Sequence, residues 1–129
     1  MDKRRFEFKV LVVEDDSFLI DTLESMLIDC GYNVFKAGDG EEALEVLHKE
    51  VIHFVVSDIQ MPRKSGYELL SEIKSSKLNK IDVLMMTGFS DIPKEKLIDL
   101  GAIAILSKPE ELVEIPDYVE TSRAKHISV

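Results

Sequence analysis

The chain has 129 residues, of which 45% are hydrophobic and 32% charged, a composition typical of one folded domain rather than a disordered chain. Its net charge of −9 argues against nucleic-acid binding, because phosphate-backbone binders cluster Lys and Arg on one face. No stretch approaches the roughly 20 apolar residues of a membrane span. The single cysteine, Cys30, excludes an intrachain disulfide. No signal-peptide pattern is visible either, so we expect a cytoplasmic protein without membrane contact.

Five short apolar segments recur along the chain, and each is bounded by polar or turn residues, which favours strands over buried helices. In chain order they span residues 8–13, 32–37, 54–56 with their flanks, 81–86 and 102–106. The second segment (YNVFKA) is more polar than the others, so we expect it near an edge of the sheet.

Stretches with apolar residues at helical spacing lie between these segments. They span residues 17–30, 41–49, 65–77 and 93–100. Asp16 or Ser17 is suited to cap the first helix, and Gly31 to end it. The alternation of strands and helices predicts a parallel α/β sheet with helices on both faces, and the near-continuous apolar strands agree with burial on both sides.

The pattern is regular over about residues 8–109 and irregular over 110–129, and we predict a single domain over 1–129. Pro116 breaks a regular helix. Either a short turn covers 110–115 and a helix begins at Pro116, which we favour, or the last helix is kinked there. The short basic stretches at 3–5 and 123–126 are expected to be solvated ends.

Ligands of open parallel sheets bind outside the carboxyl ends of the strands. The second predicted strand is followed by GDGEE, which we interpret as a plain turn and the start of a helix. Candidate site residues follow the other four strands. They are Glu14, Asp15 and Asp16 after the first strand, Asp58 after the third, Thr87 after the fourth and Lys108 after the fifth. Asp16 suits a helix cap, but a capping role does not explain Asp58.

Carboxylates gathered at one edge repel each other unless a cation lies among them, and carboxylate oxygens are ligands that Mg²⁺ prefers. A carboxylate beside Mg²⁺ can act as a nucleophile toward a phosphoryl group, whose transfer needs mainly positioning and charge neutralisation. Lys108 and the Thr87 hydroxyl can then contact phosphoryl oxygens. The pattern therefore predicts a magnesium-dependent phosphoacceptor.

Four segments resemble the response-regulator receiver domain of bacterial two-component signalling: VLVVEDD, VVSDIQMPRKSGYELL, VLMMTGFSD and ILSKP. They stand in the family's order over residues 10–109, each at a predicted strand end. The resemblance implies a flavodoxin-like, CheY-like fold, with a doubly wound sheet in strand order 2-1-3-4-5 and three layers. It also implies a signalling phosphoacceptor rather than an enzyme.

By position, the resemblance implies that Asp58 accepts phosphate from a sensor histidine kinase or a phosphotransfer protein, with an unknown downstream protein as output. Glu14 and Asp15 match the acidic pair that binds Mg²⁺, Asp15 directly and Glu14 through water. The backbone carbonyl of Gln60 matches the position that joins Asp58 on the metal, and Gly66 matches the turn beyond it.

Thr87 matches the family's switch hydroxyl, and Lys108 the lysine that pairs with the phosphate. Ile105 stands three residues before Lys108, where receivers commonly have an aromatic side chain that swings inward, so this part of the switch is not expected in its usual form. Residues 110–111 are both Glu. With Pro116 they alter the usual dimerisation face, so no oligomeric state is predicted.

Other functions fit the sequence less well. A degenerate receiver, acting as a phosphorylation-independent interaction module, predicts the loss of an acid, and all are present. A flavodoxin-like cofactor binder needs a phosphate-cradling loop where Glu14 to Asp16 stand. A phosphohydrolase usually has a second acid where Gln60 stands. His48 and His53 lack a third zinc ligand nearby, and Phe89 either shields the phosphoaspartate or merely packs.

Overall fold

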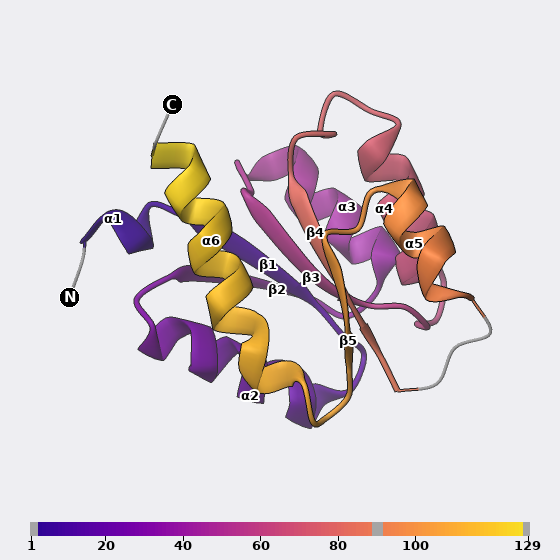
Figure 1. The fold of residues 1–129 in the computed structure, drawn as a ribbon, viewed down its shortest axis with the longest axis horizontal. Coiled ribbons are helices and arrows are strands. Elements are labelled where there is room, and N and C mark those ends of the chain that lie inside the picture. The colour runs from indigo at the N-terminus through magenta and orange to yellow at the C-terminus, as the bar shows by residue number, and fades with distance from the viewer. Residues whose placement is uncertain (1–2, 89–91, 128–129) are drawn as a thin grey trace.

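The computed structural model describes residues 3–88 and 92–127 (Figure 1). Within these residues five parallel strands form one sheet, in the order β2-β1-β3-β4-β5. The strands are β1 (Lys9–Val13), β2 (Asn33–Ala37), β3 (Phe54–Asp58), β4 (Asp82–Thr87) and β5 (Ala104–Ser107). The predicted strand order is therefore confirmed, as is the edge position of the second strand.

Helices cover both faces of the sheet, as predicted (Figure 1). They are α1 (Lys3–Phe6), α2 (Ser17–Asp29), α3 (Gly40–Lys49), α4 (Gly66–Lys74), α5 (Lys94–Leu100), the 3₁₀ turn η1 (Leu112–Glu114) and α6 (Ile115–Ile127). Helices α2 and α6 pack on one face, and α3, α4 and α5 on the other. Successive residues of each central strand alternate between these two cores, because strand side chains have a period of two.

The helix ends follow local side-chain chemistry. The Asp16 carboxylate caps α2 by accepting the backbone N–H groups of Phe18 and Leu19, as expected. Helix α4 ends at Lys74, three residues earlier than predicted. The hydroxyls of Ser75 and Ser76 donate to carbonyls of the last turn, an alternative to continuing the helix that makes serine a poor residue for a helix interior.

The C-terminal segment is a short turn followed by a helix, which confirms the favoured alternative. Helix α6 begins at Ile115, so Pro116 is its second residue. At that position a missing N–H costs no intrahelical hydrogen bond. Ile115 and Val119 are fully buried against the sheet.

The prediction that both basic stretches are solvated ends is wrong for Arg5 and Arg123. Arg123 donates two hydrogen bonds to the Glu120 carboxylate, at 2.9 and 2.7 Å, and only 8% of Arg123 is exposed. Arg5 Nε lies 3.3 Å from the same carboxylate, and the Tyr32 hydroxyl donates to it. Arg123 is the main cause that lowers the pKa of Glu120 to about 2. These contacts join α1 and α6 to the start of β2.

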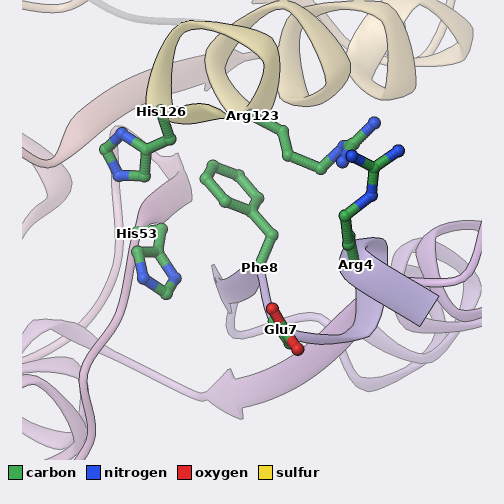
Figure 2. Close-up of a pocket in the computed structure, with 6 residues that line it drawn as sticks. All are labelled: Arg4, Glu7, Phe8, His53, Arg123 and His126. Carbon is green, nitrogen blue, oxygen red and sulfur yellow. The ribbon is translucent and has the colours of Figure 1, made fainter. Parts of the chain in front are cut away.

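A histidine pair lies where the end of α6 meets the sheet (Figure 2). The His53 ring stacks on Phe8, with ring centroids 5.0 Å apart, and the His126 ring contacts both edge-on. His53 Nδ1 accepts the backbone N–H of Lys9 at 2.9 Å. Burial lowers the pKa of His53, and His126 and Lys9 act in the same direction. His53 is therefore neutral and serves as a packed acceptor.

Acid should weaken the fold through His53. Its folded pKa lies below the ordinary value of 6.5, so the unfolded chain binds the proton more readily. The stabilising contribution is fully present above about pH 6.5 and is lost as the pH falls toward the folded pKa. We expect urea unfolding to show a steeper loss of stability between about pH 7 and 5 in the wild type than in His53→Asn.

His53→Asn is a matched control because the Asn side-chain oxygen can accept the Lys9 N–H without titrating. The overall stability of this variant falls because the ring contact with Phe8 is lost. The quantity to compare is therefore the change in the free energy of unfolding with pH. Parallel pH profiles for the two proteins would contradict a neutral His53 acceptor.

Candidate functional site

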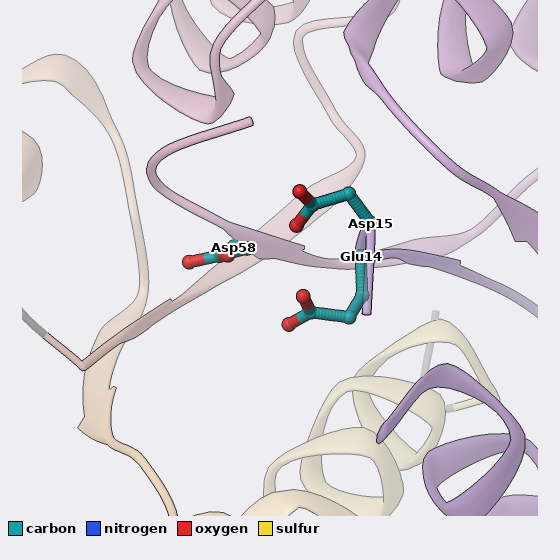
Figure 3. A group of neighbouring side chains, drawn as sticks. All are labelled: Glu14, Asp15 and Asp58. Atoms are coloured by element: carbon teal, nitrogen blue, oxygen red, sulfur yellow. The ribbon is translucent and has the colours of Figure 1, made fainter. Parts of the chain in front are cut away.

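The carboxyl ends of β1 and β3 bring three carboxylates together (Figure 3). Val13 pairs with Ser57 across the two strands, so Glu14 and Asp15 follow β1 beside Asp58, the last residue of β3. One carboxylate oxygen from each of the three acids lies within 4.8 Å of the other two. The structure thus brings together the acids that the sequence placed at one edge.

Lys108 supplies positive charge to this group. Its Nζ lies 2.7 Å from Oε1 of Glu14 and 3.1 Å from Oδ2 of Asp58. Its backbone N–H donates to the carbonyl of Thr87, which holds the end of β5 against the end of β4. In the described part of the chain, no other Lys or Arg side chain lies within 4.0 Å of these carboxylates. One ammonium therefore faces three acids.

Glu14 is the most buried acid of the group, since only 1% of its side chain is exposed. Its second oxygen accepts the backbone N–H of Asp16 at 3.1 Å. Burial raises the pKa of Glu14, although Lys108 opposes it. Burial lowers the pKa of Lys108, but its contacts with Glu14 and Asp58 outweigh burial and raise it. Lys108 is therefore a firmly charged ammonium among carboxylates.

Asp58 is oriented by the backbone that follows it. Its Oδ1 accepts the N–H of Ile59 at 2.8 Å, while Oδ2 faces Lys108. The chain then turns so sharply that the N–H of Gly66 donates to the carbonyl of Ile59 at 2.8 Å. A Cβ on Gly66 would lie 1.9 Å from the carbonyl oxygen of Asp58. Only glycine fits here, which explains its place in the predicted turn.

The remaining predicted residues lie around the same edge. Thr87 is the last residue of β4, one position beyond Met86, which pairs with Asp58. Gln60 is exposed in the loop two residues beyond Asp58. Ile105 lies half-buried in β5, against the core under α3, α4 and α5. Phe89 lies outside the described residues.

Sequence reasoning missed Asp39, which belongs to a segment interpreted as a plain turn before α3. Its carboxylate accepts the backbone N–H of Glu42 at 2.9 Å and also binds Arg63, whose Nε lies 2.8 Å away. The N–H of Gly40 donates to the carbonyl of Lys64. These bonds hold the loop between β3 and α4, which carries Gln60. The capping motif was visible in the sequence, but no pattern linked Asp39 to a residue 24 positions away.

Comparisons with known proteins agree with this geometry. The family model of the response regulator receiver domain matches residues 10–120. The chain belongs to this family. The receiver is 34% identical over 123 residues to the transcriptional regulatory protein PdtaR of Mycobacterium tuberculosis, and the match covers 93% of this chain and 60% of PdtaR. The chain spans about half the length of the curated relatives that it matches.

Solved structures show the same fold. The chemotaxis response regulator CheY4 of Vibrio cholerae superposes with a TM-score of 0.77 at 31% identity, covering 87% of this chain and 98% of CheY4. The response regulator TrrA of Thermotoga maritima, solved in complex with Mg²⁺ and BeF, gives a TM-score of 0.79 at 27% identity, covering 89% of this chain and 98% of TrrA. Among the described residues of the receiver, no helix is long and apolar enough to cross a bilayer.

The close approach at Gly66 gives a stability prediction. Gly66→Ala should lower the free energy of unfolding by about 2 kcal/mol or more, because its Cβ meets backbone that can move only by shifting the turn after Asp58. Gly88→Ala is the matched control, since no atom of the described residues lies within 4 Å of a Cβ at that position. Urea denaturation of both variants checks this. Equal stability of the two variants would show that the turn has room to relax.

Proposed function

We propose that this receiver takes a phosphoryl group onto Asp58 from a sensor histidine kinase or phosphotransfer protein, and that the modified surface then binds a different downstream partner. The observation that carries the proposal is the meeting of Asp58, two further acids and Lys108 at one edge of the sheet. In this function the receiver is a signalling component, whose only chemistry is its own phosphorylation and dephosphorylation.

The site fits Mg²⁺. Three carboxylate oxygens within 4.8 Å of one another are hard, anionic donors, which suit this ion. We propose that Asp15 and Asp58 bind it directly with the backbone carbonyl of Gln60, and Glu14 through water. TrrA, a receiver of the same fold, was solved with Mg²⁺ and BeF. When bound, Mg²⁺ would neutralise negative charge on the phosphoryl oxygens.

The chain's own residues position the reacting carboxylate. An Asp58 oxygen forms a bond to phosphorus as the bond between phosphorus and the donor's imidazole nitrogen breaks, and the leaving imidazole keeps the electron pair. The Ile59 N–H holds one Asp58 oxygen in place during this exchange. The Lys108 ammonium, 3.1 Å from the other oxygen, is placed to pair with the added phosphoryl group.

The structural response is proposed to run through Thr87 and Lys108. A phosphoryl group on Asp58 competes with Glu14 for the Lys108 ammonium, and it can also attract the Thr87 hydroxyl at the end of β4. Ile105 cannot reproduce an inward-swinging aromatic ring, so the response excludes that step.

We place the receiver in the cytoplasm and propose that, with a net charge of −9, it does not itself contact nucleic acid.

Phosphorylation with acetyl phosphate and Mg²⁺ tests this function. Intact-mass spectrometry should show one added phosphoryl group on the wild type and none on Asp58→Asn. Omitting Mg²⁺ or adding EDTA should abolish the modification. Lys108→Ala should still bind Mg²⁺ but should respond only weakly to phosphorylation, because the charged partner of the phosphate is gone.

A matched control is Lys96→Ala, which removes an exposed lysine on α5 and should be modified like the wild type. An unmodified wild type would contradict the proposal and favour a phosphorylation-independent interaction module. Equal modification of Asp58→Asn would assign the phosphoryl group to another residue.

A further inference from the structure

A groove lies between residues 47–52 and 77–81, at the edge of the sheet opposite the carboxylate group. It precedes β3 and β4, whereas Asp58 and Thr87 end these strands. Two cavities of about 350 and 300 Å³ compose it, and they share Leu47 and Leu78 in their linings. We call this feature the lysine groove, because Lys49, Lys77 and Lys80 line it.

The floor of the lysine groove is aliphatic. Leu47 is buried and Leu78 and Leu44 are half-buried, so their side chains belong to the core under α3 and α4 but also line the cavities. Val51 lies at the rim with 70% of its surface exposed. Apolar surface that stays open to water inside a groove marks a contact site more than an isolated exposed side chain does.

The rim carries lysines that form no ion pair with carboxylates of the described residues. Lys49, Lys77 and Lys80 line it together with His48. In the described part of the chain, no carboxylate oxygen lies within 4.0 Å of the ammonium nitrogen of any of these three lysines, so none of them forms an ion pair.

The carboxylates that line the groove are already engaged. Glu50 pairs with Lys9 at 3.7 Å, and Glu72 pairs with Lys64. Both cations lie outside the lining of the groove. The lysines therefore present their charge to whatever enters the groove.

We propose that the lysine groove binds an acidic, amphipathic segment of a partner protein. Leucine-like side chains of that segment would cover the floor of Leu47 and Leu78, and its carboxylates would meet Lys77 and Lys80. A nucleic acid fits less well because an aliphatic floor offers no aromatic ring for bases to stack on. The inference does not depend on phosphorylation of Asp58.

A synthetic helical peptide of Leu and Glu, labelled with fluorescein, is the probe. Fluorescence anisotropy should show that it binds the wild type and that a charge-inverted peptide, with Lys for each Glu, does not. The affinity should fall as salt is raised, because exposed charges are screened. Amide chemical-shift changes in NMR spectra should fall on residues 44–52 and 76–81 and spare Asp58.

Two variants locate the contact on the protein. Lys77→Glu combined with Lys80→Glu should weaken binding about tenfold or more, and Val51→Asp should weaken it severalfold. Lys94→Glu combined with Lys96→Glu makes the same charge change on the exposed side of α5 and should leave the affinity unchanged. Circular dichroism confirms that each variant is folded, and the inverted peptide tests the charge requirement on the wild type alone.

Each of the following results overturns the proposal. They are absence of binding to the Leu–Glu peptide, equal weakening in the α5 control, chemical-shift changes elsewhere on the surface, and binding of single-stranded RNA or phosphatidylglycerol vesicles through Lys77 and Lys80 in place of the peptide. Self-association that the Lys77→Glu and Lys80→Glu changes abolish would likewise assign the groove to a second copy of the chain.

Discussion

Repulsion among three acids at one sheet edge is the constraint on which this receiver depends. Glu14, Asp15 and Asp58 hold carboxylate oxygens within 4.8 Å of one another, and one ammonium, Lys108, contacts two of them. A single positive charge cannot balance three negative ones, so the fold maintains an arrangement that favours a further cation. The same excess of acid that costs stability would create the affinity for magnesium on which the proposed phosphoryl transfer relies.

The parallel sheet makes this arrangement possible. Its strands are buried on both faces, and their carboxyl ends all meet one edge, so side chains far apart in the sequence become neighbours there. Lys108 and Glu14 are 94 positions apart and lie 2.7 Å from each other. The turn at Gly66 and the contact between Asp39 and Arg63 hold the loop beyond Asp58. The same few residues therefore stabilise the fold and position the site.

Much of this was predictable from the sequence, because periodicity and strand-end chemistry are local signals. The apolar segments around Val10, Val55 and Val83 predicted buried strands, and the acids after the first two of these segments predicted the site. What the sequence could not predict are contacts made by long side chains between distant segments. Arg5 was expected in solvent, yet its Nε lies 3.3 Å from the carboxylate of Glu120, since a charge near a chain end looks solvated unless its partner is known. Glu14 likewise gave no sign of its burial or of its direct contact with Lys108.

The lysine groove has a different origin. It lies where α3 ends and where the segment after α4 approaches β4, at the edge that carries no carboxylate cluster among the described residues. Its aliphatic floor continues the core, and in the described part of the chain its three lysines form no ion pair, whereas its two glutamates pair with other cations. Phosphorylation and partner binding would then use opposite ends of one sheet, and each can be changed by substitution without touching residues of the other.

The thermal unfolding midpoint as a function of Mg²⁺ concentration tests the central claim most directly. If the carboxylates hold a cation only in the folded state, the wild-type midpoint rises steadily with added Mg²⁺. Asp15→Asn should melt above the wild type in EDTA, because one repelling charge is gone, and should respond to Mg²⁺ much less. A wild-type midpoint that Mg²⁺ leaves unchanged, or an equal rise in Asp15→Asn, would contradict the account.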